Sequence, residues 1–174
     1  MTTAFESTAE QYQRRVYSFA RYLLSNPEEA EDVTQEVLLR LWRHRDGVEQ
    51  ERVGAWLLRV TRNACYDLLR RRRAAAAHGV EVAGGLEGEE AQSLASTEPD
   101  PESRMRDADF RRRLLEELGR LGEPYKSVVI LREVQGLSHR EIGEALGIPE
   151  VTVRVHLHRG RLKLREQLRE ERRP

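Results

Sequence analysis

A single stretch near the middle of this 174-residue chain cannot contribute to a packed core. Residues 74–108 are rich in Ala, Gly, Glu, Ser and Pro, show no regular apolar spacing, and carry eight acidic side chains against two arginines. Segments of this composition bury too little apolar surface to fold alone and behave as mobile tethers. The sequence therefore predicts two small domains, at 1–73 and 109–174, joined by a flexible acidic linker at 74–108.

The neutral total charge hides a basic excess outside this linker. The chain has 30 basic and 30 acidic residues, so the two predicted domains together are positively charged. Nearly all the basic residues are arginine, whose planar fork suits phosphates and base edges. A single cysteine, Cys65, excludes an intrachain disulfide and fits a reducing compartment. No apolar run is long enough to span a membrane, so we expect a cytoplasmic protein.

Both predicted domains have apolar residues at helical spacing and no strand pattern, which predicts an all-α fold. Ser7 with Glu10 and Ser138 with Glu141 have the spacing of capping boxes, and Asn26 before a proline is a favourable N-cap. The expected helices begin at Ser7 and Pro27 and cover about 53–73 in the first domain, and 109–120, 124–134, 138–146 and 150–171 in the second.

The C-terminal domain contains the pattern of a helix-turn-helix. Leu-Gly-Ile-Pro at 146–149 predicts a sharp stop and restart between two helices, and the second helix of such a motif can enter the DNA major groove. Its core face is predicted at Val153, Leu157 and Gly160, while Val155 lies on the opposite, basic face, where it can touch a thymine methyl. A solvated charged face is the alternative. The predicted DNA-contacting residues are Thr152, Arg154, Val155, His156, His158, Arg159 and Arg161.

A second basic face lies on the helix expected at 53–73. Five residues spaced as one side of a helix form this basic stripe: Arg59, Arg62, Asn63, Tyr66 and Arg70. Arginines can hold phosphates and tyrosine offers a stacking plane, so the stripe suits nucleic acid. The alternative is a solvated face with Tyr66 half-packed.

The helix that begins at Pro27 has a face of a different kind. Its acidic and polar character, with one exposed leucine, suits a protein partner better than DNA, although a lone exposed leucine is common. The predicted partner-binding residues are Asp32, Gln35, Glu36, Leu39 and Arg43.

The sequence predicts no metal, cofactor or catalytic site. His156 and His158 are two positions apart and point in different directions on a helix, whereas helical metal-binding pairs are spaced by four. A glycine-rich phosphate loop and a nucleophile elbow are both absent from the sequence.

Three segments in a fixed order carry a family resemblance. AEDVTQEVLLRLW, WLLRVTRNACYDLLRR and, after the acidic linker, LREVQGLSHREIGEALGIPEVTVRVHLHRGR resemble the bacterial RNA polymerase sigma factors of the extracytoplasmic-function (ECF) class. The resemblance implies an alternative sigma factor without enzymatic activity, which binds the clamp helices and flap of core RNA polymerase and directs it to promoter DNA. It assigns the face of Asp32, Gln35 and Glu36 to the clamp, the loop 44–55 and the basic stripe to the −10 element, and residues 152–161 to the −35 element.

Two positions depart from the family pattern. Val155 stands where serine is common and His156 where arginine is common, so the family's usual −35 preference does not carry over directly. Two other functions stay open at this point: a helix-turn-helix regulator that works without polymerase, and an interaction protein that retains sigma-like domains. Anti-sigma factors are frequent partners in this family, and the sequence leaves open whether one acts here.

Overall fold

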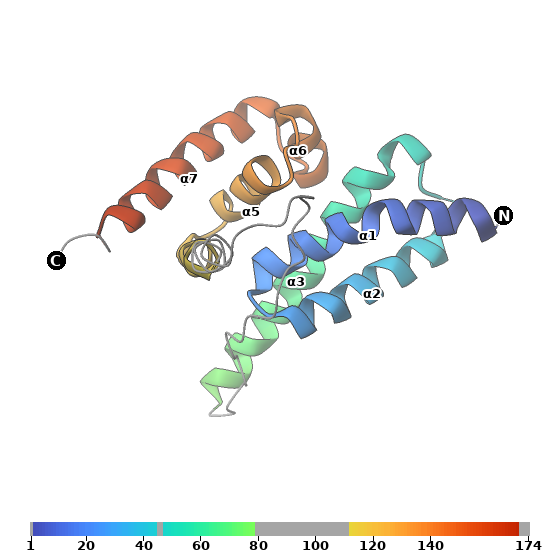
Figure 1. Cartoon of the computed structure of the whole chain (residues 1–174), viewed down its shortest axis with the longest axis horizontal. Coiled ribbons are helices and arrows are strands. Elements are labelled where there is room, and N and C mark those ends of the chain that lie inside the picture. The colour runs from blue at the N-terminus through green and yellow to red at the C-terminus, as the bar shows by residue number, and fades with distance from the viewer. Residues whose placement is uncertain (1, 45–46, 79–111, 171–174) are drawn as a thin grey trace, which may run out of the picture.

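The computed structural model describes residues 2–44, 47–78 and 112–170, and within these ranges every regular element is a helix. The predicted linker at 74–108 falls largely outside the described residues. Three long helices form the N-terminal domain, and the elements after residue 111 form the C-terminal domain, which packs beside it (Figure 1). The all-α prediction is confirmed for the described part of the chain.

The N-terminal domain is a bundle of α1 (Thr2–Leu24), α2 (Pro27–His44) and α3 (Val53–Ala77). A short 3₁₀ turn, η1 (Gln50–Arg52), leads into α3. Each helix turns one apolar face inward, and the fully buried side chains include Phe19 of α1, Val37 of α2 and Leu57 of α3. Burial of each such side chain contributes about 1.5–3 kcal/mol.

Two boundaries of the N-terminal helices differ from the prediction. Helix α1 begins at Thr2, so the predicted capping box of Ser7 and Glu10 is wrong and both residues lie within the helix. Helix α3 continues to Ala77 through a run of alanines, which are the best helix formers. The predicted N-cap of α2 is confirmed, because the Glu29 amide donates to Asn26 Oδ1 at 3.2 Å.

The C-terminal domain consists of a helix at 112–120, then α5 (Tyr125–Val129), η2 (Ile130–Val134), α6 (His139–Leu146) and α7 (Glu150–Glu170). The single helix predicted at 124–134 is continuous, but its second half, η2, is a π-helix. Ser138 and Glu141 form both hydrogen bonds of the predicted capping box.

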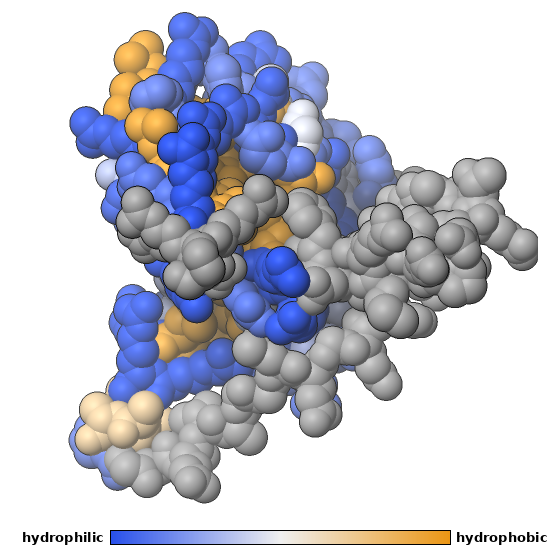
Figure 2. All heavy atoms as spheres, turned by 60° about the vertical axis from the view of Figure 1, so that its left-hand side comes forward, coloured by the Kyte–Doolittle hydropathy of each residue, from blue (hydrophilic) through white to orange (hydrophobic). Residues whose placement is uncertain are grey.

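On the face of the molecule shown in Figure 2, polar and charged side chains surround smaller apolar patches.

The turn between α6 and α7 depends on two glycines. Gly147 ends α6 in the left-handed conformation at φ +69°, which a side chain disfavours, and the Ile148 amide returns to the Gly143 carbonyl at 3.0 Å. Gly143 itself has no room for a side chain, because a Cβ there would lie 2.8 Å from the Ile148 carbonyl oxygen. This close approach sets the angle at which α7 leaves the turn.

The lone cysteine belongs to the N-terminal core. Cys65 lies on the inner face of α3 and is fully buried. Burial raises the pKa of its thiol to about 12, because the low-polarity surroundings disfavour the thiolate. The thiol is therefore neutral throughout the physiological range and acts as a small apolar side chain.

We expect Gly143→Ala to destabilise the C-terminal domain by about 1–3 kcal/mol, since the new methyl group would push against backbone that cannot move aside. Gly119→Ala is the matched control, because it lies in the helix at 112–120 with nothing within 4 Å of its Cβ. That change should stabilise by up to about 1 kcal/mol through helix propensity. Chemical denaturation followed by circular dichroism compares the two; equal effects would contradict the steric role of Gly143.

We expect Cys65 to react with the thiol reagent DTNB at pH 8 roughly a thousandfold more slowly in the folded protein than in the unfolded one, because its raised pKa and burial suppress the thiolate. Stopped-flow absorbance with and without guanidinium gives the two rates. Comparable rates would show that α3 exposes its inner face readily.

Candidate nucleic-acid and partner surfaces

Helix α7 presents the mixed face that the sequence predicted. Val153 and Leu157 are buried, whereas Val155 is 43% exposed on the opposite side. The positions predicted to contact DNA divide between exposed and half-buried: Arg154, Val155, His158, Arg159 and Arg161 are exposed, and Thr152 and His156 are half-buried. The structure thus brings five of the seven side chains together on one accessible surface.

Charge on this surface is partly neutralised within the domain. Arg154 pairs with Glu150 at 2.9 Å, and Arg161 pairs with Glu133 at 2.5 Å. Both pairs are exposed, so each stabilises the fold by at most about 1 kcal/mol and can be exchanged for a phosphate. Arg159 forms no ion pair among the described residues and is already available as a donor.

His156 has a different environment from its neighbours. Its ring packs edge-on against Tyr125, with 5.7 Å between ring centroids, and its Nδ1 is buried without a hydrogen-bond partner in the described structure. This side chain therefore helps to pack α7 on α5, and a contact to DNA from it stays a prediction. Within the described residues no group of three potential ligands could hold a metal ion.

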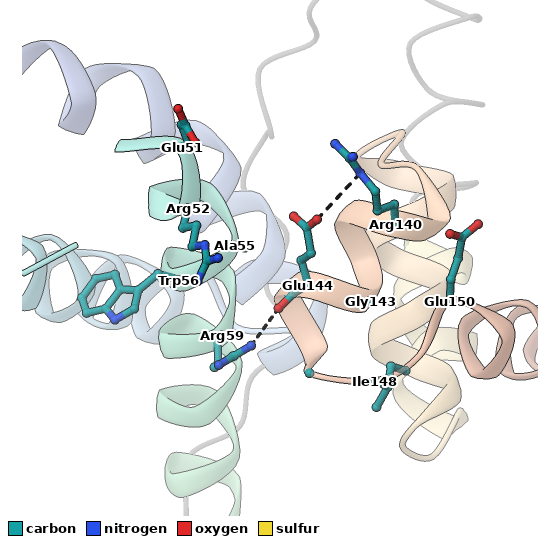
Figure 3. Close-up of a pocket in the computed structure, with 11 residues that line it drawn as sticks. Glu51, Arg52, Ala55, Trp56, Arg59, Arg140, Gly143, Glu144, Ile148 and Glu150 are labelled. Atoms are coloured by element: carbon teal, nitrogen blue, oxygen red, sulfur yellow. Dashed lines mark hydrogen bonds and ion pairs between the residues drawn. The ribbon is translucent and has the colours of Figure 1, made fainter. Parts of the chain in front are cut away.

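The basic stripe of α3 faces the C-terminal domain. Arg59 donates through its guanidinium to the carbonyl oxygens of Glu144 at 2.8 Å and Ala145 at 3.4 Å, at the end of α6 (Figure 3). The C-terminal carbonyls of a helix lack partners within the helix and attract cations. Asn63 and Arg70 are exposed, and Arg70 pairs with Asp67 of its own helix.

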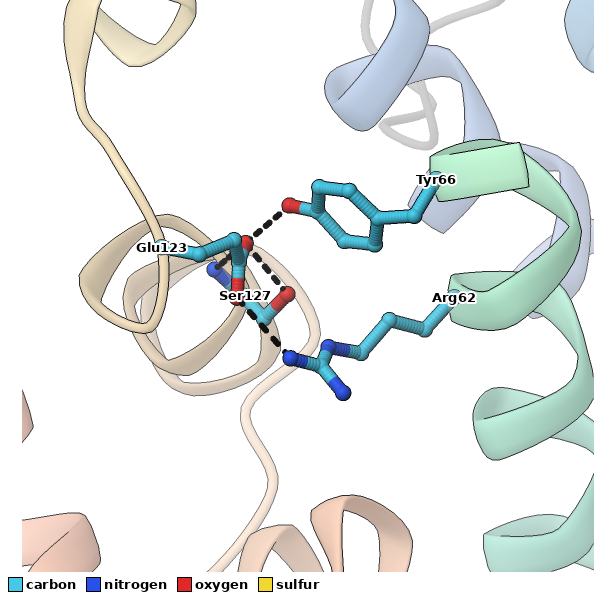
Figure 4. Close-up of polar contacts among 4 residues, drawn as sticks. All are labelled: Arg62, Tyr66, Glu123 and Ser127. Atoms are coloured by element: carbon cyan, nitrogen blue, oxygen red, sulfur yellow. Dashed lines mark hydrogen bonds and ion pairs between the residues drawn. The ribbon is translucent and has the colours of Figure 1, made fainter. Parts of the chain in front are cut away.

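Glu123 engages the next two residues of the stripe. Arg62 approaches one carboxylate oxygen at 3.3 Å, and the Tyr66 hydroxyl donates to the other (Figure 4). Burial and the neighbouring carboxylate raise the pKa of Tyr66 far above its ordinary value, so the phenol remains a donor. Sequence reasoning missed Glu123, since one acid before a proline gives no sign of its partners.

A cleft of about 810 Å³ lies where the two domains meet (Figure 3). One wall is η1 and the start of α3, with Arg52, Trp56 and Arg59. The other is the helix-turn-helix, with Arg140 and Glu144. Acidic and basic groups both line it, and Arg140 Nε lies 3.7 Å from Glu144 Oε1. This mixed lining is typical of a boundary between two domains and favours no single small ligand.

Helix α2 carries the face that the sequence predicted to bind a protein partner. Its five predicted residues, Asp32, Gln35, Glu36, Leu39 and Arg43, are all exposed, and Leu39 is 56% exposed. Trp42, at 39% exposure, adds a large aromatic group three positions after Leu39, and the sequence analysis missed it although helical spacing would have found it. An exposed tryptophan is typical of the centre of a protein interface, and charged groups around it are typical of the rim.

Comparison with known proteins matches each domain separately. Residues 8–75 match the family model for sigma-70 region 2, and residues 111–164 match that for sigma-70 region 4. The chain is 32% identical to the ECF RNA polymerase sigma factor SigW of Bacillus subtilis, over 96% of this chain and 90% of that protein. It is also 32% identical to the ECF RNA polymerase sigma factor SigE of Mycolicibacterium smegmatis, over 95% of this chain but only 62% of the relative's length.

The fold also matches a solved structure. The sigma factor RpoE of Bartonella quintana, in a complex with the anti-sigma factor NepR, superposes with a TM-score of 0.71 at 24% identity. The match covers 97% of this chain and 99% of that one. At this identity the likeness establishes the fold.

Proposed function

The chain belongs to the sigma-70 family of RNA polymerase sigma factors, and on that premise we propose which of its surfaces contacts each partner. It is an alternative sigma factor of the ECF class, which binds core RNA polymerase and promoter DNA and directs transcription initiation. No helix in the described part of the chain is long and apolar enough to cross a membrane. We further propose that it acts in the cytoplasm and has no catalytic activity of its own.

The C-terminal domain, at 109–174, is assigned to the −35 element. The observation that carries this assignment is the exposed face of α7, which a glycine-dependent turn presents beyond α6. A recognition helix in the major groove reads base edges with arginine and thymine methyls with apolar contacts. Val155 is the apolar residue on that face, and Arg154 and Arg159 are the donors.

The N-terminal domain, at 1–73, is assigned to the −10 element and to the polymerase. The basic stripe of α3 combines three arginines with a tyrosine, which is the chemistry that captures an unpaired strand. The exposed carboxylates and apolar side chains of α2 supply a separate surface for the polymerase clamp.

Run-off transcription tests the function against its rivals. Purified protein is mixed with core polymerase from the source bacterium and a library of promoter fragments from the same genome. A sigma factor gives discrete, promoter-specific transcripts only when the protein is present. A duplex-binding regulator would shift the DNA without giving transcripts, and an interaction protein would do neither.

Solved relatives suggest one further partner. The Bartonella sigma factor is described in a complex with an anti-sigma factor. We propose that an antagonist of this kind also binds the present chain, which co-purification from the source bacterium would test.

Asp32→Arg should weaken binding to core polymerase roughly tenfold, because it reverses a charge at the proposed interface. Glu36→Arg should act in the same direction. Both side chains are exposed, so the free energy of unfolding should change by only about 0.5 kcal/mol. Glu10→Arg, with the same charge change on α1, is the control; biolayer interferometry on immobilised core that shows equal losses for α1 and α2 variants would refute a specific α2 interface.

Val155→Ser should shift the −35 preference at one base pair by on the order of 1 kcal/mol, because a hydroxyl replaces an apolar contact to a thymine methyl. Stability should change little, since the side chain is exposed. Binding-site selection with both proteins measures the preference. Identical −35 logos would mean that Val155 faces solvent in the complex.

A further inference from the structure

The interface between the domains occupies the surface that the proposed function assigns to single-stranded DNA. Three of the five stripe residues are engaged: Arg59 by the end of α6, and Arg62 and Tyr66 by Glu123 (Figures 3 and 4). Arg62 and Tyr66 at the centre of the stripe are half-buried, while Asn63, Arg70 and the bonded Arg59 are exposed. In this arrangement an unpaired strand cannot reach the centre of the stripe.

The Glu123 carboxylate is held in place for this contact. The Ser127 amide donates to its Oε1 at 3.1 Å and the Ser127 hydroxyl donates to the same oxygen at 2.7 Å (Figure 4). These bonds fix the carboxylate at the start of α5, where it projects toward α3. An oxyanion that accepts from an arginine and a tyrosine presents the chemistry of a DNA phosphate.

The contact with Arg62 is incomplete. Its terminal nitrogen reaches Glu123, but its Nε is buried and has no hydrogen-bond partner in the described structure. A buried donor without a partner raises the free energy of the state that contains it. A phosphate that accepts from both edges of the guanidinium would satisfy this nitrogen, so the contact is suited to exchange.

Two further hydrogen bonds, both to α1, also join the two domains. We call this arrangement, in which the C-terminal domain packs against α1 and α3, the closed arrangement. Lys126 Nζ donates to the Leu23 carbonyl at the end of α1 at 2.9 Å, and Gln135 Nε2 donates to the Arg15 carbonyl at 2.8 Å. Lys126 is almost fully buried by this contact. The closed arrangement therefore rests on several contacts along α1 and α3.

The closed arrangement is incompatible with a promoter. The −35 and −10 elements are separated by about 25 base pairs, or roughly 85 Å of duplex at ~3.4 Å per pair. Domains that touch cannot reach both elements at once. The exposed face of α7 remains accessible in this state, so closure masks one DNA surface and leaves the other open.

We propose that Glu123 is an intramolecular competitor of the −10 strand, which keeps the free chain in a closed form until the domains are separated. This rests on the proposed assignment of the basic stripe to single-stranded DNA. Binding of core polymerase to both domains would supply the separation, because it fixes them at promoter spacing. The apparent affinity of the free chain for a single strand is then reduced by the fraction of molecules that are closed.

The test uses the full chain and a fluorescein-labelled 20-nucleotide oligothymidylate. Glu123→Gln keeps the shape of the side chain but removes its charge, and it should raise affinity on the order of fivefold, with a larger radius of gyration in X-ray scattering. Glu116→Gln is the matched control, because this acid pairs with Arg112 of its own helix. It removes the same charge without touching α3 and should change neither quantity.

A second variant separates closure from simple charge repulsion. Gln135→Ala removes a contact to α1 without changing any charge. Like Glu123→Gln, it should raise both the affinity for the oligothymidylate and the radius of gyration. If Glu123→Gln alone raises affinity and the radius is unchanged, the effect is local charge and the closed form is refuted. If neither variant alters affinity, the competition is refuted.

A third variant reports on the stripe itself. Arg70→Ala lies outside the closed interface and should lower affinity for the oligothymidylate if the stripe binds DNA. A loss with Arg70→Ala but no gain with Glu123→Gln would retain the proposed DNA surface and overturn the competitor. If neither variant changes the affinity for the oligothymidylate, both the proposed DNA surface and the competition by Glu123 are overturned.

Discussion

The packing of the two described domains depends on reciprocal capping of helix ends across the boundary between them. Arg59 of the N-terminal domain donates to the last carbonyls of α6, and Lys126 of the C-terminal domain donates to the Leu23 carbonyl at the end of α1. The carbonyls at a helix C-terminus lack intrahelical partners and carry partial negative charge, so a cation satisfies both needs. Each domain thus supplies a cationic side chain to the C-terminal end of a helix in the other.

Helix α3 connects this boundary to function because its two faces have opposite character. The inner face, with Leu57 and Cys65, is fixed in the apolar core. The outer face is an arginine-rich stripe that needs anionic or carbonyl partners, and in the free chain it finds them on the C-terminal domain. The same stripe has the chemistry to take a DNA phosphate in place of these partners, as we propose, because carboxylates, helix carbonyls and phosphates all accept hydrogen bonds from arginine.

Specific residues separate what could be predicted from what could not. The N-cap at Asn26, the capping box at Ser138 and the stop between two helices at 146–149 follow local rules, and the structure confirms each of them. The start of α1 was predicted too late because Ser7 offered a plausible cap, yet the helix continues through it to Thr2. The exposed position of Trp42 could be predicted from its helical spacing to Leu39. The role of Glu123 could not, since its partners lie about sixty positions away in the sequence.

The sequence by itself determined the helices, their buried faces and the family, because these depend on short-range periodicity, caps and motif order. Only the tertiary structure decided what the exposed faces meet. Helical spacing places Arg59, Arg62 and Tyr66 on one side of α3, but it cannot show that α6 and Glu123 lie opposite them. Contacts between segments far apart in the chain depend on how whole domains pack, and no local pattern encodes that geometry.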